Sequence, residues 1–179
     1  MQWLSIGAAV VLANAATIRA NPEGLCADHV RSDDQAVRQW VQHGCDRSVT
    51  FRTLAGRVGE LHGIVYIQPV RHIRNGLQAA LQFSVITTPT GRYFRVLLDV
   101  HASEDRAIAA IGHELQHAIE ALQDPSAVSE ATMRELFERL KITGMTTRPR
   151  GEYETEAAVK AGVRIASELK EHPTGHDLR

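Results

Sequence analysis

Basic residues are not in excess in this chain of 179 residues, because 20 Lys and Arg stand against 21 Asp and Glu and leave a net charge of −1. A protein that binds a phosphate backbone needs surplus positive charge, so the balance argues against nucleic-acid binding. Aromatic residues make up only 5% of the chain, too few for the stacking platform of a single-strand binder. The 44% of hydrophobic residues indicates one ordinary globular domain.

Cysteine is scarce as well. Cys26 and Cys45 are the only two, and they do not form a Cys-x-x-Cys pair, which argues against thioredoxin-like chemistry and a Cys-type zinc site. In an oxidising compartment such a pair predicts one disulfide. The alternative is two buried, reduced thiols in a cytosolic protein.

A hydrophobic run long enough to span a membrane is also missing at the start of the chain. The segment from Trp3 to Ile18 lacks Asp, Glu, Lys and Arg, but it is shorter than the roughly 20 apolar residues that a spanning helix needs. Small residues follow at Ala15 and Ala20, which predicts a signal peptide over residues 1–20 and export to the periplasm or the extracellular space. An N-terminal helix packed on the domain and an uncleaved membrane anchor are the alternatives. After cleavage we expect no stable membrane insertion, one domain over residues 21–172 and a flexible polar tail over 173–179.

Hydrophobic spacing predicts mainly helices, with a few strands in the middle of the chain. The expected helices cover about 33–44, 48–62, 104–123, 126–140 and 152–171. A strand at 64–67 ends at Pro69, and two hairpin arms at 79–88 and 92–100 flank Pro89-Thr90-Gly91. We therefore expect a single α+β domain with a small antiparallel sheet packed on helices.

The segment with most chemical potential is His113-Glu114-Leu115-Gln116-His117, inside the helix expected at 104–123. Residues four apart share a helical face, so both imidazoles can reach one metal ion. Glu114 is offset from them by one residue, where a carboxylate can take a proton from a metal-bound water. The apolar residues of this helix cluster on the opposite side. The pattern predicts a metal site with Glu114 as the general base.

A catalytic zinc site usually has a third protein ligand and an open position for water. Glu154 is the expected third ligand, because the spacing places it in the apolar stripe of the last helix, where an ionised carboxylate needs a cation. Glu156 is the second choice for the third ligand. Glu120, one turn beyond His117 on the same face, is a further candidate. Three ligands from one convex helix rarely converge on one point, so we expect Glu120 to be solvated or to contact a ligand rather than to be one. A first-turn Glu that stabilises the helix N-terminus is the competing interpretation of Glu154.

These residues resemble the zincin metallopeptidases, specifically the gluzincin branch, which pairs His-Glu-x-x-His on one helix with a Glu from a later helix. The resemblance implies a minimal zincin-like domain, in which a C-terminal helix backs the active-site helix. It also implies one Zn²⁺ per chain held by His113, His117 and Glu154, with Glu114 as general base. In these families the third ligand commonly precedes an Ala by three residues, as Glu154 precedes Ala157, and that Ala is usually followed by Asp, whereas this chain has Ala158. That Asp would orient a ligand His, so we expect Glu120, Asp99 or a backbone carbonyl to replace it.

The resemblance further implies an edge strand that binds an extended peptide, for which residues 92–100 are the candidate. It also implies an oxyanion stabiliser, and the candidates are Tyr153, Tyr66, Tyr93 and His101. We therefore expect a zinc-dependent metallohydrolase, most simply a peptidase acting on a peptide or protein. The alternative is a non-catalytic binding module on a zincin scaffold, with a structural metal or none.

Overall fold

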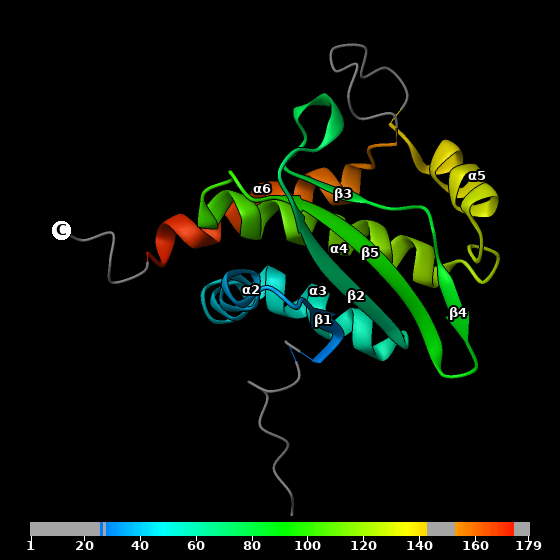
Figure 1. Ribbon diagram of the computed structural model, residues 1–179, viewed down its shortest axis with the longest axis horizontal. Coiled ribbons are helices and arrows are strands. Elements are labelled where there is room, and N and C mark those ends of the chain that lie inside the picture. Colours follow the sequence, from blue (N-terminus) through cyan, green and yellow to red (C-terminus); the bar gives the residue numbers. More distant parts are fainter. Residues whose placement is uncertain (1–25, 27, 143–152, 174–179) are drawn as a thin grey trace, which may run out of the picture.

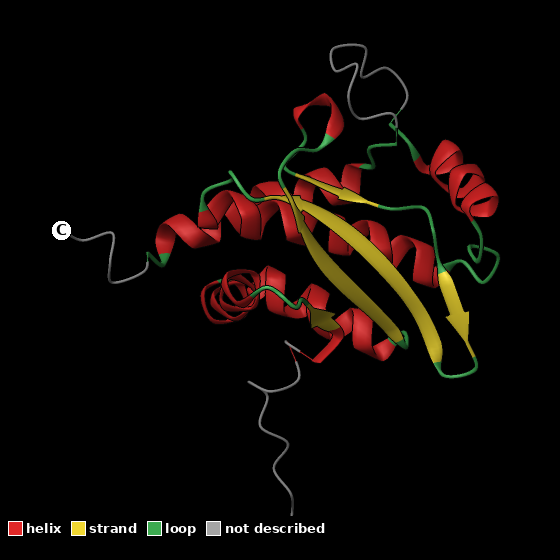
Figure 2. Ribbon diagram, in the orientation of Figure 1, coloured by secondary structure: helices red, strands yellow, loops and turns green. Residues whose placement is uncertain are grey.

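The computed structural model of this chain describes residues 26, 28–142 and 153–173. The expected signal peptide at 1–20 and residues 174–179 of the expected tail lie outside the described residues, as does most of the loop before residue 153. The described part is an α+β domain, as predicted, with a small sheet covered by helices (Figure 1, Figure 2).

The sheet is mixed rather than antiparallel, which corrects the prediction. Its order is β1 (Val30–Arg31), β2 (Gly63–Val70), β5 (Gly91–Asp99) and β3 (Ala79–Leu81), and β4 (Ile86–Thr88) also pairs with β5. The β1–β2 and β2–β5 pairs are parallel, whereas β3 and β4 run antiparallel to β5. The chain leaves β2 at one end and returns through β3 and β4 on the far side of β5. This return makes β5 parallel to β2.

Two expected strands differ in extent from the prediction. The first hairpin arm, 79–88, is divided into the short strands β3 and β4, which both pair with β5. Strand β2 continues through Pro69 instead of ending there. The carbonyl of Ile67 accepts a hydrogen bond from Ser32 beside β1, so the nitrogen of Pro69, two residues on, faces the same side. Because β1 has ended by that point, Pro69 interrupts no ladder hydrogen bond.

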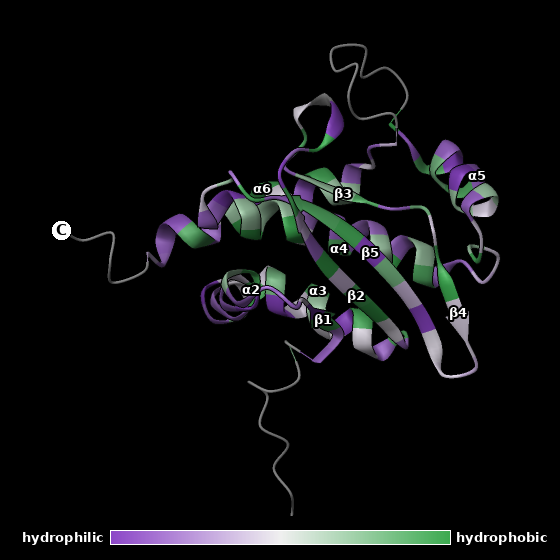
Figure 3. Ribbon diagram, in the orientation of Figure 1, coloured by the Kyte–Doolittle hydropathy of each residue, from purple (hydrophilic) through white to green (hydrophobic). Residues whose placement is uncertain are grey.

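The helices are α2 (Gln35–Arg47), α3 (Val49–Glu60), α4 (Glu104–Gln123), α5 (Glu130–Leu140) and α6 (Glu156–Glu171). Two of them begin later than predicted because side chains cap them: Ser129 and Thr132 form a capping box before α5, and Thr155 caps α6. Strand β5 begins with hydrophilic residues and becomes mainly hydrophobic toward its end (Figure 3). Burial alternates along it, and Phe94, Val96 and Leu98 are buried in the core. Within the described part of the chain, no helix is both long and apolar enough to cross a bilayer.

Helix α6 packs along α4 (Figure 1), and glycine permits this close approach. A Cβ on Gly112 of α4 would lie 2.1 Å from Cδ1 of Ile165. A Cβ on Gly162 of α6 would lie 3.4 Å from Cβ of His113. The packing therefore brings the first turns of α6 alongside the turn of α4 that carries His113.

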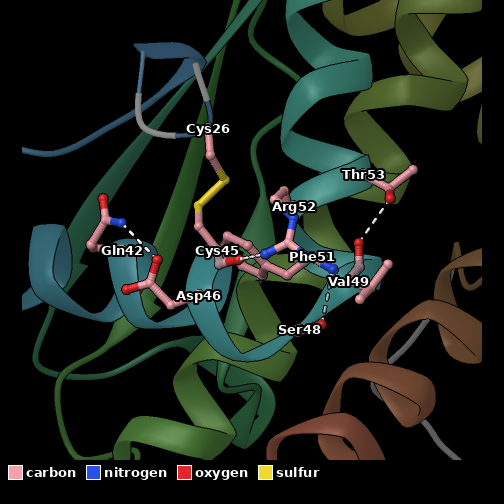
Figure 4. Close-up of a disulfide and its surroundings, with 9 residues drawn as sticks. All are labelled: Cys26, Gln42, Cys45, Asp46, Ser48, Val49, Phe51, Arg52 and Thr53. Carbon is pink, nitrogen blue, oxygen red and sulfur yellow. Dashed lines mark hydrogen bonds between the residues drawn. A yellow bond between two sulfur atoms is a disulfide. The ribbon is translucent and has the colours of Figure 1, made fainter. Parts of the chain in front are cut away.

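The predicted disulfide between Cys26 and Cys45 is present (Figure 4). It joins the chain just before β1 to the C-terminal part of α2, and both residues are 3% exposed. The bond closes a loop of about 20 residues, which in the chain-entropy description stabilises the fold by about 3 kcal/mol.

Candidate metal centre

His113 and His117 lie one turn apart on α4, as predicted. Their ring centroids are 4.9 Å apart, with the rings steeply inclined to each other at 76°. The opposite face of α4 carries Ile108, Ile111 and Leu115, which are fully buried. Burial of that apolar stripe fixes the rotation of the helix, so both imidazoles are directed to the side where a cavity opens.

Glu154 joins the two histidines, but from a different local structure than predicted. Its Oε2 lies 3.1 Å from Nε2 of His113. The expectation that it belongs to the apolar stripe of the last helix is wrong, because α6 begins at Glu156 with Thr155 as its N-cap. Glu154 instead lies just before the cap, outside the helix, and its side chain reaches across to His113 of α4.

The three residues His113, His117 and Glu154 each offer one ligand atom, and these atoms all lie within 4.8 Å of one another. Two imidazole nitrogens and one carboxylate oxygen are a donor set that suits zinc. Tetrahedral zinc with bonds of 2.0–2.1 Å places its ligand atoms about 3.3 Å apart, close to the observed separation of His113 and Glu154. The residues present therefore fit a zinc ion, and a tetrahedral ion held by three ligands has one further position.

The other two candidate ligands are placed elsewhere. Glu156 is exposed on the first turn of α6 and forms an ion pair with Lys160, which lowers the pKa of its carboxyl below the usual value. Glu120 is nearly buried and faces His117, with its Oε2 3.1 Å from Nδ1 of that ring. Glu156, the second candidate for the third ligand, thus does not join His113, His117 and Glu154. Glu120 contacts the Nδ1 atom of His117 instead of joining them.

A hydrogen-bonded chain connects the start of α6 to His117. Thr155 Oγ1 donates to Oε1 of Glu120 at 2.7 Å, and Oε2 of Glu120 holds Nδ1 of His117. When His117 donates its Nδ1–H to the Glu120 carboxylate, the lone pair of Nε2 is left for a metal. Of the groups expected to orient a ligand histidine, Glu120 is thus one that contacts His117. The alternative, Asp99, instead accepts the backbone N–H of His101.

The site carries excess negative charge around His113. Burial by itself lowers the pKa of this imidazole, but the hydrogen bond to Glu154 and the charges of Glu114, Glu154 and Glu120 outweigh burial and raise the pKa above its ordinary value. A group of carboxylates that favours the charged form of a histidine equally favours a bound cation.

Glu114 is buried beside the cluster, with 8% of its surface exposed. Its Oε2 accepts the backbone N–H of Leu81 at 2.8 Å. This amide is available because the adjacent residue Gln82, not Leu81, donates to β5. The edge strand β3 thus fixes the carboxylate that the sequence predicts to be the general base. The sequence pattern contained no signal for this backbone contact.

One cavity of about 330 Å³ contains this site. His113, Glu114, His117 and Glu154 line one part of it, while Leu81, Phe83, Arg134, Phe137 and Tyr153 are among the residues that line the rest. Phe83, Arg134 and Phe137 were not predicted as site residues. Only the amphipathic spacing of 126–140 pointed to Phe137, and that spacing indicated burial rather than a site.

The strand expected to bind a peptide is wrongly assigned. Residues 92–100 correspond to β5, which pairs with β2 on one side and with β3 and β4 on the other. Its hydrogen-bonding groups are therefore occupied, and the outer edge of the sheet at the site belongs to β3. Among the oxyanion candidates Tyr153 lines the cavity, whereas Tyr66, Tyr93 and His101 are not among its lining residues.

Comparison of the chain with protein-family models, with curated proteins and with solved structures finds no match.

Proposed function

We propose that this protein is a zinc-dependent metallohydrolase of the gluzincin type, with peptides or proteins as substrates. The observation that carries the proposal is the convergence of His113, His117 and Glu154 in one cavity with the buried carboxylate of Glu114 beside them. Three ligands and an adjacent carboxylate are the combination that a hydrolytic zinc site uses.

In this proposal His113, His117 and Glu154 hold the ion. A zinc ion held there would act as a Lewis acid, polarising a carbonyl and lowering the pKa of water toward about 7. Glu114 accepts the proton that the attacking water loses as its oxygen bonds to the scissile carbonyl carbon. The same carboxyl then returns that proton to the leaving nitrogen as the C–N bond breaks. The Leu81 N–H holds one oxygen of Glu114 in place, so the carboxyl is already oriented before a substrate arrives.

The test uses the purified mature chain, its metal content measured by mass spectrometry and its cleavage of a casein-derived peptide mixture. We expect one zinc per chain and cleavage that a chelator abolishes. Glu114→Gln is expected to keep the zinc and to lose cleavage by at least a hundredfold. Glu156→Gln makes the same chemical change at an exposed position outside the cluster, so it is expected to retain both.

Two results would contradict the proposal. Full cleavage by Glu114→Gln would exclude that residue as the general base. Zinc bound by the wild type without cleavage of any peptide in the mixture would favour a non-catalytic binding module on this scaffold.

We also propose that the protein is exported. The Cys26–Cys45 disulfide supports this, since stable disulfides form mainly in oxidising compartments, and the uncharged N-terminal segment agrees with it. The mass of the mature chain tests the proposal. Cleavage after Ala15 removes residues 1–15 and cleavage after Ala20 removes residues 1–20, whereas an anchored protein keeps them.

A further inference from the structure

The cavity at the metal centre has two chemically different parts. The polar part is formed by the histidines of α4, by Glu114 and by Glu154. The other part is apolar and aromatic, and it is built from the segment that follows β3, from α5 and from the residue before Glu154. A cavity of about 330 Å³ is at the lower end of the size range for ligand pockets. Such a space suits one large side chain next to the reacting group.

The aromatic part is a packed wall that reaches a proposed zinc ligand directly. Phe83 stacks on Phe137 of α5, with ring centroids 5.3 Å apart, and meets Tyr153 edge-on at 5.1 Å. Phe137 in turn lies perpendicular to the ring of His117 at 5.2 Å. These contacts hold the rings in fixed orientations. An apolar surface therefore begins directly beside the ring of His117.

Charged groups around this wall already have partners. The Arg134 guanidinium lies 5.9 Å from the centre of the Phe83 ring, donates to the hydroxyl of Tyr153 and pairs with Glu130. Glu114 accepts from Leu81, and Glu154 pairs with His113. A charged side chain that entered the cavity would lose its hydration and would compete with these existing pairs, whereas removing an apolar side chain from water is favourable.

We infer that the wall formed by Phe83, Phe137 and Tyr153 is a specificity pocket that selects a large apolar side chain, aromatic or long aliphatic, next to the scissile bond. The inference rests on the proposed function, because the zinc ion would set where the reacting carbonyl lies relative to the wall. It identifies the substrate class as peptides with such a residue, and it identifies Phe83 as a specificity-determining residue.

The test measures binding rather than turnover, with amino-acid hydroxamates that chelate zinc and carry one side chain. The zinc-loaded protein is titrated by calorimetry with the hydroxamates of glycine, phenylalanine, lysine and glutamate. Burial of a phenyl side chain predicts that the phenylalanine compound binds at least about tenfold more tightly than the glycine compound. The lysine and glutamate compounds are expected to bind no more tightly than the glycine compound.

Phe83→Ala is expected to reduce the preference for phenylalanine over glycine hydroxamate to less than about threefold, with the zinc content unchanged. Ile86→Ala is the matched control, because Ile86 is an exposed apolar residue that does not line the cavity, and it is expected to keep the full preference. If Phe83→Ala does not fold, Phe83→Leu serves instead and is expected to give an intermediate preference.

The outcomes separate the two proposals. Equal binding of all four hydroxamates, or a preference for lysine or glutamate, would overturn the specificity pocket and leave the zinc site intact. Failure of the protein to bind zinc, or of every hydroxamate to bind the zinc-loaded protein, would overturn the proposed function and the pocket with it.

Discussion

The hydroxyl of Thr155 donates to Glu120 at 2.7 Å, and the same oxygen accepts the N–H of Ala158. One side chain thus begins α6 and also fixes the carboxylate that holds Nδ1 of His117. Glu154 precedes this cap directly, so the cap also determines where the third proposed ligand lies. The orientation of two proposed ligands, His117 and Glu154, therefore depends on the same hydroxyl.

Thr155→Val is expected to weaken zinc binding and to destabilise the protein. The change keeps the shape of the side chain but leaves Glu120 without its donor and α6 without its N-cap. Loss of such an orienting partner typically lowers metal affinity by about 10- to 100-fold, and loss of an N-cap costs about 1 kcal/mol of unfolding free energy. A competitive titration with a zinc indicator and urea unfolding measure the two effects. Thr155→Ser keeps the hydroxyl and is expected to keep most of the zinc affinity and most of the stability. Wild-type zinc affinity in Thr155→Val would show that the hydroxyl plays no part in orienting the proposed ligands.

Glu154→Gln and Glu156→Gln are expected to differ sharply in zinc affinity, although the two residues are separated only by Thr155. Glu154 lies against His113, whereas Glu156 is exposed and pairs with Lys160. An amide is a poor zinc ligand, so Glu154→Gln is expected to lose at least about tenfold in affinity. The same indicator titration measures both variants. Equal affinities would remove Glu154 from the ligand set.

Gly112→Ala and Gly56→Ala are expected to change stability in opposite directions. A Cβ on Gly112 would meet Ile165, which is fully buried, so the close contact of α4 with α6 would be strained. We expect a loss of about 1–3 kcal/mol in unfolding free energy, as is typical of an overpacked core. Gly56 of α3 has nothing within 4 Å of the added carbon, so alanine is expected to gain about 0.5–1 kcal/mol through its helix propensity. Urea unfolding of both variants measures the difference, and equal effects would show that the α4–α6 contact accommodates a methyl group.

Glu168 is expected to stabilise the fold at neutral pH and to lose this effect in acid. Burial alone would raise the pKa of its carboxyl, but hydrogen bonds from Ser48 and from the hydroxyl and backbone N–H of Thr50 lower it to about 2. Because the folded pKa lies below the ordinary value of 4.5, the contribution is complete above about pH 5 and disappears as the pH falls toward 2.

Urea unfolding of the wild type and of Glu168→Gln at several pH values tests this prediction. The wild type is expected to be more stable by about 2 kcal/mol at pH 7. The difference is expected to shrink steadily between pH 5 and pH 2. A difference that does not change with pH would contradict the role of the ionised carboxylate.

Local periodicity was enough to predict the helices and the relative placement of His113, Glu114 and His117 on one of them. The spacing of His113 and His117 depends only on the geometry of one helix, and so does the offset of Glu114. The apolar residues on the other side of α4 predicted correctly which face would be buried. The pairing of Cys26 with Cys45 followed from there being only two cysteines.

Contacts between distant segments were beyond the reach of that reasoning. The sequence identified Glu154 for an apolar stripe that it does not occupy, because the cap at Thr155 moves the start of α6. It assigned the free edge of the sheet to residues 92–100, although β3 and β4 cover that edge. Phe83 and Phe137 lie far apart in the chain and meet only after folding.

The difference between what the sequence predicted and what it missed has a physical reason. Helix faces and ligand spacing follow from backbone geometry within a few residues, so the sequence by itself determined the α+β class, the disulfide pair and the motif His113-Glu114-Leu115-Gln116-His117. Packing between elements determines which strand lies at the edge, how closely α4 and α6 approach, and what surrounds the cluster of His113, His117 and Glu154. The tertiary structure therefore decided that Glu154 rather than Glu156 lies with the two histidines, that Glu120 rather than Asp99 contacts His117, and that an aromatic wall borders these residues.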